Sequence, residues 1–439
     1  MYVSKIALDL FRSWKHIVCD FKPSVNIIYG NNGFGKTNIV EAIEFASTGI
    51  SHRTSSTIPL ITRGSTTSTI RLNICNNSTE LVENNNQTTY EINLSLKGSN
   101  RARINGGKSL YIKDIVGLLP VVSFTPRDQS LVIGDPTIRR TFLDQAGTLL
   151  IPNYAKYLQD FKHIAKQRAA LLKNIREFSY ANQPVSLSGL EIWTGKFIES
   201  GIRITKLRNK TVQILNKYFS KIIKSLTSSE ENATLKYEPS FEEVFINKNL
   251  EEDNLEDILE NSLEDNTEDN TEDTLENNIE INNLLSEHFK RIYPGELARG
   301  CNLIGPHRDN INFMLDNMPA KDFASNGESW TISIAIKMAL CKALEEINNE
   351  NPIIILDDVF AQLDENRRKQ ILNFSKKQGQ VFITTSSLND IPEDDEINSN
   401  NLINIEKIYE EQKNIDNLNS LHNDFIKEII ANRNCEQKD

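Results

Sequence analysis

The first third of the chain alternates apolar and polar side chains in the manner of β-strands. Residues 1–10 show this two-residue period, and an apolar run at 25–29 follows them. The segment 38–49 has the composition of a helix. Gly98-Ser99-Asn100 separates two strand-like runs and predicts a hairpin. The strand-like runs in this part of the chain are 69–74, 90–96 and 101–105.

The middle of the chain changes to a helical period near Thr137. Two stretches, 137–180 and 187–227, carry apolar residues three and four positions apart and contain almost no glycine or proline. Pro184 interrupts the pattern between them, so we expect a pair of long antiparallel helices. No heptad repeat persists over several turns, which argues against an extended coiled coil.

A second α/β stretch covers residues 287–390. It contains two apolar strands, 351–356 and 380–385, with a helix at 366–376 between them. Such apolar runs are typical of the central strands of a mostly parallel sheet that helices cover on both faces. Residues 391–439 are polar, and we expect them to end in a helix and a frayed tail.

These patterns predict an α/β protein in which one domain interrupts another. The two α/β stretches, 1–136 and 287–439, are expected to form a single head domain. The helical middle, 137–286, is expected to project from this head as an arm or lid.

The chain of 439 residues carries a formal net charge of −11, but the charge is unevenly distributed. Residues 251–280 contain 14 Asp or Glu and no Lys or Arg, and the rest of the chain has 46 acidic against 49 basic residues. A segment so rich in like charge predicts a disordered insertion, at about 247–283, which we interpret as a solvated spacer. The net charge therefore does not argue against nucleic acid as a partner.

Composition also bears on the compartment. The hydrophobic fraction of 38% is typical of a soluble protein, and no stretch approaches the roughly 20 apolar residues of a membrane helix. Residues 1–10 lack the pattern of a secretory signal. The cysteines are scattered without metal-binding spacing, so we expect reduced thiols in the cytoplasm. They are Cys19, Cys75, Cys301, Cys341 and Cys435.

The strand at 25–29 leads directly into a glycine-rich octapeptide. Two glycines that bracket four residues, followed by Lys and a hydroxyl, match the phosphate-binding loop. Glycines let backbone N–H groups surround phosphate oxygens, and the following helix adds the positive end of its dipole. Lys36 is expected to reach the β- and γ-phosphates, and the Thr37 hydroxyl to ligate Mg²⁺. The predicted nucleotide site is Gly30, Asn31, Asn32, Gly33, Phe34, Gly35, Lys36 and Thr37, with Asn38 after them.

A glycine turn ahead of an ordinary helix is the alternative, and two motifs downstream argue against it. The apolar strand at 353–356 ends in Asp357 and Asp358. At the carboxyl end of such a strand, Asp357 can reach the Mg²⁺ held by Thr37. Asp358 faces the other way and is expected to orient the attacking water or accept its proton. The alternative for this pair is a capping role at the turn. Lys36, Asp357 and Asp358 are thus the candidate catalytic residues.

The other motif is the turn Ser325-Asn326-Gly327 ahead of a helix rich in Ile, Ala and Met. Free N–H groups and the helix dipole make such a turn an anion site, although a plain serine cap has the same sequence. Ser325 precedes Asp357 by 32 residues. The order of turn, helix and Asp-Asp strand is the one found in ATPases of the ABC class. There the signature turn contacts the γ-phosphate bound in the opposite protomer, so Ser325 and Gly327 are candidate ATP contacts.

Together these motifs resemble the RecF family, recombination mediators related to the ABC, SMC and Rad50 heads. The resemblance covers nearly the whole chain apart from the acidic insertion. It implies an ABC-type P-loop ATPase head with an inserted helical arm. Trp330 departs from the family, which usually has Arg there, and this bears on the strength of head-to-head closure. The motifs lie at 30–38, 51–54, 123–128, 134–144, 305–309, 325–328 and 356–364.

The resemblance implies a protein that binds ATP with Mg²⁺, forms an ATP-dependent homodimer and binds DNA at single-strand/double-strand junctions or gaps. With RecO and RecR it would help to load the RecA recombinase in DNA repair, replication restart and the SOS response. A weak DNA-dependent ATPase activity would act as a switch. Asp358 stands where transport ATPases usually carry Glu, and its shorter side chain suits slow turnover.

Basic residues of the arm and its approaches are the candidate DNA contacts, because each neutralised phosphate strengthens binding. No base-reading motif is present, so contact is expected to follow phosphates and shape. His307 lies in a His-Arg-Asp cluster and is interpreted as structural. The DNA-contact candidates are Arg139, Arg140, Lys166, Arg168, Lys173 and Arg176.

Two other protein classes share the nucleotide motifs. The ATPase subunit of an ABC transporter has a shorter helical insert, and no membrane-coupling sequence is evident here. An SMC- or Rad50-like architectural ATPase has long coiled coils, whereas this helical middle is short and irregular in period.

Overall fold

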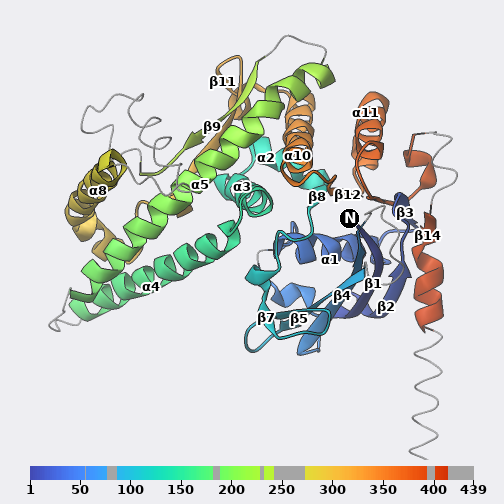
Figure 1. Ribbon diagram of the computed structural model, residues 1–439, viewed down its shortest axis with the longest axis horizontal. Coiled ribbons are helices and arrows are strands. Elements are labelled where there is room, and N and C mark those ends of the chain that lie inside the picture. The colour runs from blue at the N-terminus through green and yellow to red at the C-terminus, as the bar shows by residue number, and fades with distance from the viewer. Residues whose placement is uncertain are drawn as a thin grey trace, which may run out of the picture. The chain divides into compact units, whose positions relative to one another are not determined.

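The computed structural model describes residues 1–54, 56–76, 87–180, 188–227, 232–241, 272–392 and 401–413 (Figure 1). The chain forms two compact units. The first combines Met1–Ile115, Leu119–Pro126 and Glu350–Asp439, and the second combines Val116–Leu118 with Arg127–Asn349. Each unit has its own sheet structure and its own buried side chains.

A five-stranded parallel sheet forms one layer of the first unit, in the order β14-β3-β13-β12-β8. All five positions of β12 are buried, which confirms the predicted central strand. Because the strands run parallel, the carboxyl ends of β3 and β12 lie at one edge, separated only by β13. The strands are β3 (Val25–Tyr29), β8 (Val121–Phe124), β12 (Ile353–Asp357), β13 (Val381–Thr385) and β14 (Asn401–Asn404).

A six-stranded antiparallel sheet forms a second layer, in the order β2-β1-β4-β5-β6-β7. Strands β4 and β5 alternate buried and partly exposed positions, so one face of the sheet packs inward and the other meets solvent. Strands β5 and β6 pair as the predicted hairpin. The strands are β1 (Tyr2–Phe11), β2 (Trp14–Asp20), β4 (Thr67–Cys75), β5 (Gln87–Ser95), β6 (Arg101–Ile104) and β7 (Leu110–Tyr111).

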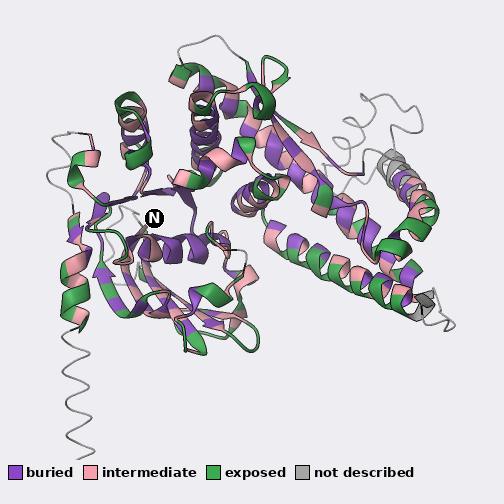
Figure 2. Cartoon of the chain, turned by 180° about the vertical axis from the view of Figure 1, so that it is seen from behind, coloured by how far each residue is buried: buried purple, intermediate pink, exposed green. Residues whose placement is uncertain are grey.

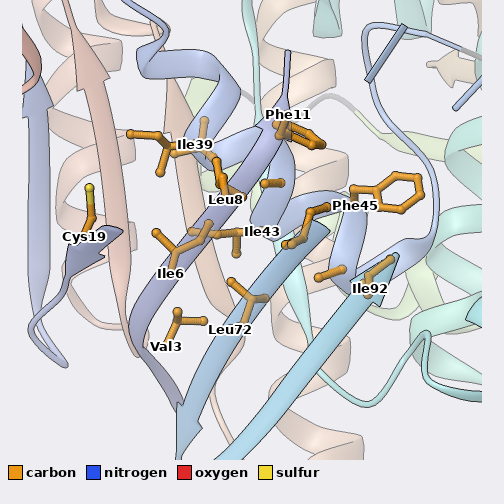
Figure 3. Close-up of a cluster of buried hydrophobic side chains, with 14 of the residues drawn as sticks. Val3, Ile6, Leu8, Phe11, Cys19, Ile39, Ile43, Phe45, Leu72 and Ile92 are labelled. Atoms are coloured by element: carbon orange, nitrogen blue, oxygen red, sulfur yellow. The ribbon is translucent and has the colours of Figure 1, made fainter. Parts of the chain in front are cut away.

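Helix α1 (Lys36–Thr48) shares one hydrophobic core with both sheets. Ile43 of this helix lies beside Ile6 of β1 and Leu72 of β4 (Figure 3). The same cluster contains Ile355 of β12, which belongs to the parallel sheet. The start of the helix is therefore held against both layers of the unit. Helix α11 (Glu365–Lys376) lies between β12 and β13 in the sequence, at the predicted place.

Long helices dominate the second unit. Helices α4 (Tyr154–Tyr180) and α5 (Ser188–Thr227) pack side by side, which confirms the predicted long pair. The stretch expected as one helix from 137 to 180 is broken at Pro152 and Asn153, which has a positive φ of 62°. Helix α3 (Pro136–Leu150) precedes this break. In Figure 2, exposed residues run along α4, whereas buried residues predominate in α10 (Asn326–Asn348).

A small antiparallel sheet, β11-β10-β9, completes the second unit. Strand β9 packs against α5, and α10 packs against α5 as well. The sheet consists of β9 (Ala233–Glu238), β10 (Asn310–Leu315) and β11 (Met318–Pro319).

The compact units do not coincide with the two predicted domains. Helix α10 and strand β10 were expected in the head, but they belong to the unit that contains the long helices. The physical reason is burial: most of α10 is apolar, and α5 supplies part of its cover. The division of the chain into a head and an arm, with boundaries at residues 136 and 287, stays a prediction.

The acidic segment was predicted to be disordered over about 247–283, and this boundary is wrong. Helix α8 (Glu272–Arg299) begins inside it, so residues 272–283 are helical. Residues 247–271 lie outside the described part of the chain. Residues 405–413 are helical, as expected near the C-terminus, and 414–439 also lie outside the described residues.

Of the helices in the described ranges, none combines the length and apolarity that crossing a lipid bilayer requires.

A buried ionic cluster holds the second unit together. The guanidinium group of Arg208 donates to Asp144 Oδ1 at 2.9 Å and to Asp309 Oδ2 at 2.9 Å. Only 3% of the Arg208 side chain and 1% of the Asp309 side chain are exposed. The hydroxyl of Tyr154 donates to Asp144 at 2.8 Å, and that of Tyr237 donates to Asp309. The cluster thus joins α3, α5, β9 and the turn before β10.

We predict that Arg208→Met lowers the free energy of unfolding by about 3–5 kcal/mol, because two buried carboxylates then lose their counter-charge. Urea denaturation followed by circular dichroism measures this change. The control is Arg203→Met on the same helix, where an exposed guanidinium lies 5.0 Å from the Tyr157 ring centroid. That variant should lose about 1 kcal/mol or less. Equal urea midpoints for the two variants would contradict this account of the cluster.

Candidate nucleotide-binding site

The glycine-rich loop leaves the carboxyl end of β3 and enters α1 with a backbone that glycine alone suits. Gly30, Gly33 and Gly35 have φ values of 138°, 93° and 87°. A Cβ atom on Gly35 would lie 2.7 Å from Nε1 of Trp14. That same Nε1 donates a hydrogen bond to the carbonyl of Gly35 at 3.1 Å. The buried indole therefore fixes the loop at the residue before Lys36.

The Lys36 side chain turns back into the loop. Its Nζ donates to the carbonyls of Gly30 and Asn31 at 2.7 and 3.0 Å and to Oδ1 of Asn32 at 3.2 Å. Burial lowers the pKa of Lys36, although the carboxylates of Asp358 and Asp357 oppose that shift. The ammonium group of Lys36 thus lies inside the loop, where the motif predicts that this residue contacts phosphate.

The structure brings Thr37 and Asp357 together, as the motif spacing predicted. Thr37 Oγ1 donates to Asp357 Oδ1 at 2.9 Å, and Thr384 Oγ1 donates to the same oxygen at 2.6 Å. Burial raises the pKa of Asp357. No group of three or more His, Cys, Asp or Glu side chains could hold a metal within the described ranges. One hydroxyl and one carboxylate are the set that a magnesium–nucleotide complex takes from a protein.

Asp358 adopts a different geometry from Asp357. Its φ is 54°, and its N–H donates to the carbonyl of Thr384 at 3.2 Å. Its Oδ1 is buried and has no hydrogen-bond partner among the described residues. Burial, followed by the charge of Asp357, raises the pKa of Asp358. A carboxylate with an unused oxygen and a raised proton affinity suits a general base.

Sequence reasoning from the residues missed a second row of polar groups beside Asp357. His52 Nδ1 lies 2.5 Å from Glu44 Oε2, and His52 Nε2 lies 3.8 Å from Asp357 Oδ2. Although burial lowers the pKa of His52, the neighbouring carboxylates, Glu44 foremost, raise it above its ordinary value. Ser123 of β8 donates to the other Glu44 oxygen. The only signal in the sequence was the segment 51–54, which entered through the resemblance alone.

A second buried acid on α1, Glu41, gathers arginines beside the loop. Arg12 Nε donates to Glu41 Oε2 at 2.9 Å, and Arg53 Nη1 donates to the same oxygen at 3.1 Å. Arg53 also donates to Oδ1 of Asn38 at 2.8 Å. A cavity of about 710 Å³ opens there. Its lining includes Arg12, Ser13, Asn38, Arg53, Thr62 and Arg63.

The helix at 405–413 also contacts the loop, which no local sequence signal indicated. Glu406 Oε1 accepts a hydrogen bond from the Asn31 N–H at 2.6 Å. The ring of Tyr409 lies 5.3 Å from that of Phe34 and 6.1 Å from that of Trp14, centroid to centroid. The loop is therefore supported by a segment that lies some 375 residues away in the sequence.

The Ser325 turn lies in the second unit, at the start of α10. Ser325 is the N-cap: its Oγ accepts from the Glu328 N–H at 3.3 Å, and Glu328 Oε2 accepts from the Ser325 N–H at 2.7 Å. Gly327 occupies the first turn of this long helix. The structure thus confirms a capped helix start here, while the contact of Ser325 and Gly327 with ATP stays a prediction.

The predicted DNA contacts divide by burial, and two of them are wrong on physical grounds. Arg168 is fully buried and pairs with Glu296, with Nη2 and Oε2 2.6 Å apart. Arg139 is 3% exposed and donates to Oδ1 of Asn310 at 3.0 Å and to the carbonyl of Gly134 at 2.9 Å. Neither guanidinium group is accessible to a phosphate.

The other four candidates reach solvent. Lys166 and Lys173 are exposed on α4, and Arg176 on the same helix is half-buried, with Nη1 donating to the carbonyl of Arg299 at 2.9 Å. Arg140 is half-buried and donates to the carbonyl of Asp309 at 2.8 Å. His307 is packed beside Phe197, which agrees with a structural role.

Comparison with known proteins places these features in a family. Residues 2–404 match the family described as RecF/RecN/SMC N terminal domain. The chain is 50% identical over 398 residues to the DNA replication and repair protein RecF of Bifidobacterium adolescentis. The aligned region covers 90% of this chain and 89% of that protein. The protein of the same name from Renibacterium salmoninarum is 33% identical over 402 residues, covering 89% and 96%.

Solved structures agree with this match. A structure of the recombination mediator protein RecF with ATP, described as part of the RecFOR pathway, gives a TM-score of 0.71 at 27% identity. The similarity covers 89% of this chain and 93% of that chain. A second structure of a recombination mediator protein RecF gives the same TM-score at 26% identity and covers 90% and 94%. These similarities confirm the predicted ATPase head fold.

We predict that Gly35→Ala weakens ATP binding by about tenfold or more, because a left-handed residue with a side chain costs about 1–2 kcal/mol. The new methyl group would also collide with Trp14. Titration with a fluorescent ATP analogue measures the affinity. The control is Gly106→Ala, at a φ of +66° with no atom within 4 Å of the added Cβ. Parent-like affinity in both variants would refute the role of Trp14 as a support for the loop.

Proposed function

This chain belongs to the RecF family, and on that premise we propose that it is an ATP-dependent recombination mediator. The observation that carries the proposal is the contact between Thr37 and Asp357 beside the Lys36 ammonium group. The contact supports a magnesium–nucleotide site because it brings a hydroxyl and a carboxylate together, in a chain whose relatives are named for DNA replication and repair.

ATP is proposed to bind with its phosphates in the loop from Gly30 to Asn38. The phosphate oxygens would replace the carbonyl oxygens that now accept from Lys36. Thr37 and Asp357 would hold Mg²⁺, which neutralises charge on the β- and γ-phosphates. The nucleoside end would extend toward the cavity lined by Arg12 and Arg53.

Hydrolysis to ADP and phosphate is proposed to be slow and to serve as a switch. Asp358 would orient the attacking water and accept its proton, since its Oδ1 is unused and its pKa is raised by burial. His52 and Thr384 would position Asp357 from either side through their contacts with its carboxylate.

Dimerisation would complete the site. Ser325 and Gly327 of one protomer are proposed to contact the γ-phosphate bound by the partner, because they lie at the positive end of a long helix dipole. The ATP-bound dimer would bind gapped or junction DNA through phosphate contacts by Arg140, Lys166, Lys173 and Arg176. With RecO and RecR it would promote RecA loading in the cytoplasm.

We predict that Lys36→Ala abolishes both ATP-dependent steps, because losing charged hydrogen bonds weakens ATP binding about 10- to 100-fold. Light scattering should show that ATP converts the parent protein, but not the variant, from monomer to dimer. Binding to gapped, blunt and single-stranded DNA, each with ATP, ADP or no nucleotide, should show the same loss. Lys377→Ala, at an exposed lysine on the same unit, is the control. Unchanged dimerisation and DNA affinity in Lys36→Ala would end the proposal.

We predict that Asp358→Asn separates binding from hydrolysis. The amide preserves the shape of the side chain but cannot accept a proton, so the rate of phosphate release should fall about 100-fold. ATP affinity should stay within about twofold, and the ATP-bound dimer should persist longer. Asp357→Asn should instead weaken magnesium-dependent ATP binding. Parent-like turnover by Asp358→Asn would remove that residue from the mechanism.

A further inference from the structure

A strongly basic segment lies at the edge of the six-stranded sheet, in the unit that contains the glycine-rich loop. Residues 97–113, which comprise β6, β7 and their flanking turns, contain five Lys or Arg and no Asp or Glu. We name this segment the basic hairpin. Its basic residues are Lys97, Arg101, Arg103, Lys108 and Lys113.

The pleat directs two of these charges away from the core. Ala102 is fully buried in the hydrophobic core of the unit. Because side chains alternate along a strand, its neighbours Arg101 and Arg103 belong to the opposite, solvent-facing side of the sheet. Tyr111 pairs with Arg101 across β6 and β7, so it shares that outer face, where it is 45% exposed.

The Tyr111 ring gathers two cations. The guanidinium carbon of Arg101 lies 4.1 Å from the ring centroid, and Nζ of Lys113 lies 5.9 Å from it. Each contact is individually favourable, but together they hold two like charges near one exposed ring. An anion that docks there would relieve their repulsion.

The acids near the hairpin are already engaged by other groups. Glu91, opposite Arg103, accepts from Arg71 Nε at 2.8 Å, and Arg71 foremost, with Arg103, lowers its pKa. Asp114 Oδ2 accepts from the Tyr111 N–H at 2.8 Å. Across the described ranges, none of the five basic side chains of the hairpin forms an ion pair within 4.0 Å. Glu91 offsets part of the Arg103 charge, but it is shared with Arg71, so this face keeps a net positive charge.

We propose that the basic hairpin is a second DNA-contact surface, which binds the phosphate backbone. The inference rests on the DNA binding proposed above and adds a surface on the unit that binds ATP. Arg101 and Arg103 project about 7 Å apart, on the scale of the spacing of successive phosphates along a strand. The Tyr111 ring adds a platform on which an unpaired base of a gap can stack.

Phosphate fits this face better than an acidic protein does. Stable protein interfaces have an apolar, well-packed centre surrounded by a polar rim. Here the centre of the face consists of Arg101, Arg103 and Tyr111, and the turn beyond it, residues 105–109, is exposed and polar. A polyanion that needs charge rather than apolar cover is the partner that this composition suits.

The test compares DNA affinity of the full-length protein with ATP. A fluorescein-labelled gapped duplex and a labelled single strand are titrated with the parent protein and with the double variant Arg103→Gln/Lys108→Gln. Fluorescence anisotropy is measured at several salt concentrations between about 50 and 200 mM. We expect affinity to fall about tenfold and the slope of log K against log salt to drop by about 2.

The control variant removes two charges elsewhere on the same unit. Lys22→Gln/Lys377→Gln changes two exposed lysines and should bind DNA as the parent protein does. ATP affinity and the thermal midpoint should be unchanged in both double variants. If Arg103→Gln/Lys108→Gln is less stable, Lys108→Gln alone, in the exposed turn, should lower the salt slope by about 1. Tyr111→Leu should weaken single-strand binding more than duplex binding.

The outcomes separate this inference from the proposed function. ATP-dependent DNA binding by the parent protein, with equal affinity and salt slope in the hairpin variant, would overturn the inference and leave the proposed function standing. Loss of affinity for RecR without loss of DNA affinity would assign the face to a protein partner and also overturn the inference. Failure of the parent protein to bind any DNA would overturn both.

Discussion

The placement of Asp357 at the end of a fully buried parallel strand is the constraint on which the rest of the site depends. A carboxylate in that position is costly unless donors satisfy it, and Thr37 and Thr384 supply them from α1 and β13. Those contacts require β3, β13 and β12 to be adjacent, which their parallel pairing provides. The same order places Lys36 and Asp358 beside Asp357, so the sheet topology and the proposed nucleotide site depend on one set of interactions.

Helix α1 connects this edge to the rest of its unit. Its apolar face packs in a core common to both sheets. On the same helix, Glu41 contacts Arg12 and Glu44 contacts His52. A helix that begins at Lys36, the lysine proposed to bind phosphate, is thereby held rigidly by packing and by buried charge. The contact of Glu406 with the Asn31 N–H extends that support to the described C-terminal helix.

Basic residues have two different structural roles in this protein, one when they are buried and one when they are exposed. Arg208 and Arg168 are buried and paired with Asp144 and Glu296, so their positive charge stabilises the second unit internally. The exposed lysines of α4 and the basic residues of the hairpin at 97–113 keep their charge at the surface, where a polyanion can neutralise it. A count of basic residues in the sequence cannot separate these roles, because buried, ion-paired residues and exposed basic residues both occur on amphipathic helices and strands.

Local patterns in the sequence determined much of this protein: the glycine-rich loop with the phosphate-binding motif, the buried strand that ends in Asp357, the long helices and the family resemblance. Each depends on period, spacing or turn chemistry, which act over a few residues. Tertiary structure alone decided that Arg139 and Arg168 are buried, that α10 packs against α5, and that His52, Trp14 and Glu406 contact the site. These outcomes depend on which distant segments pack together, and burial then decides whether a charge meets a protein partner or solvent.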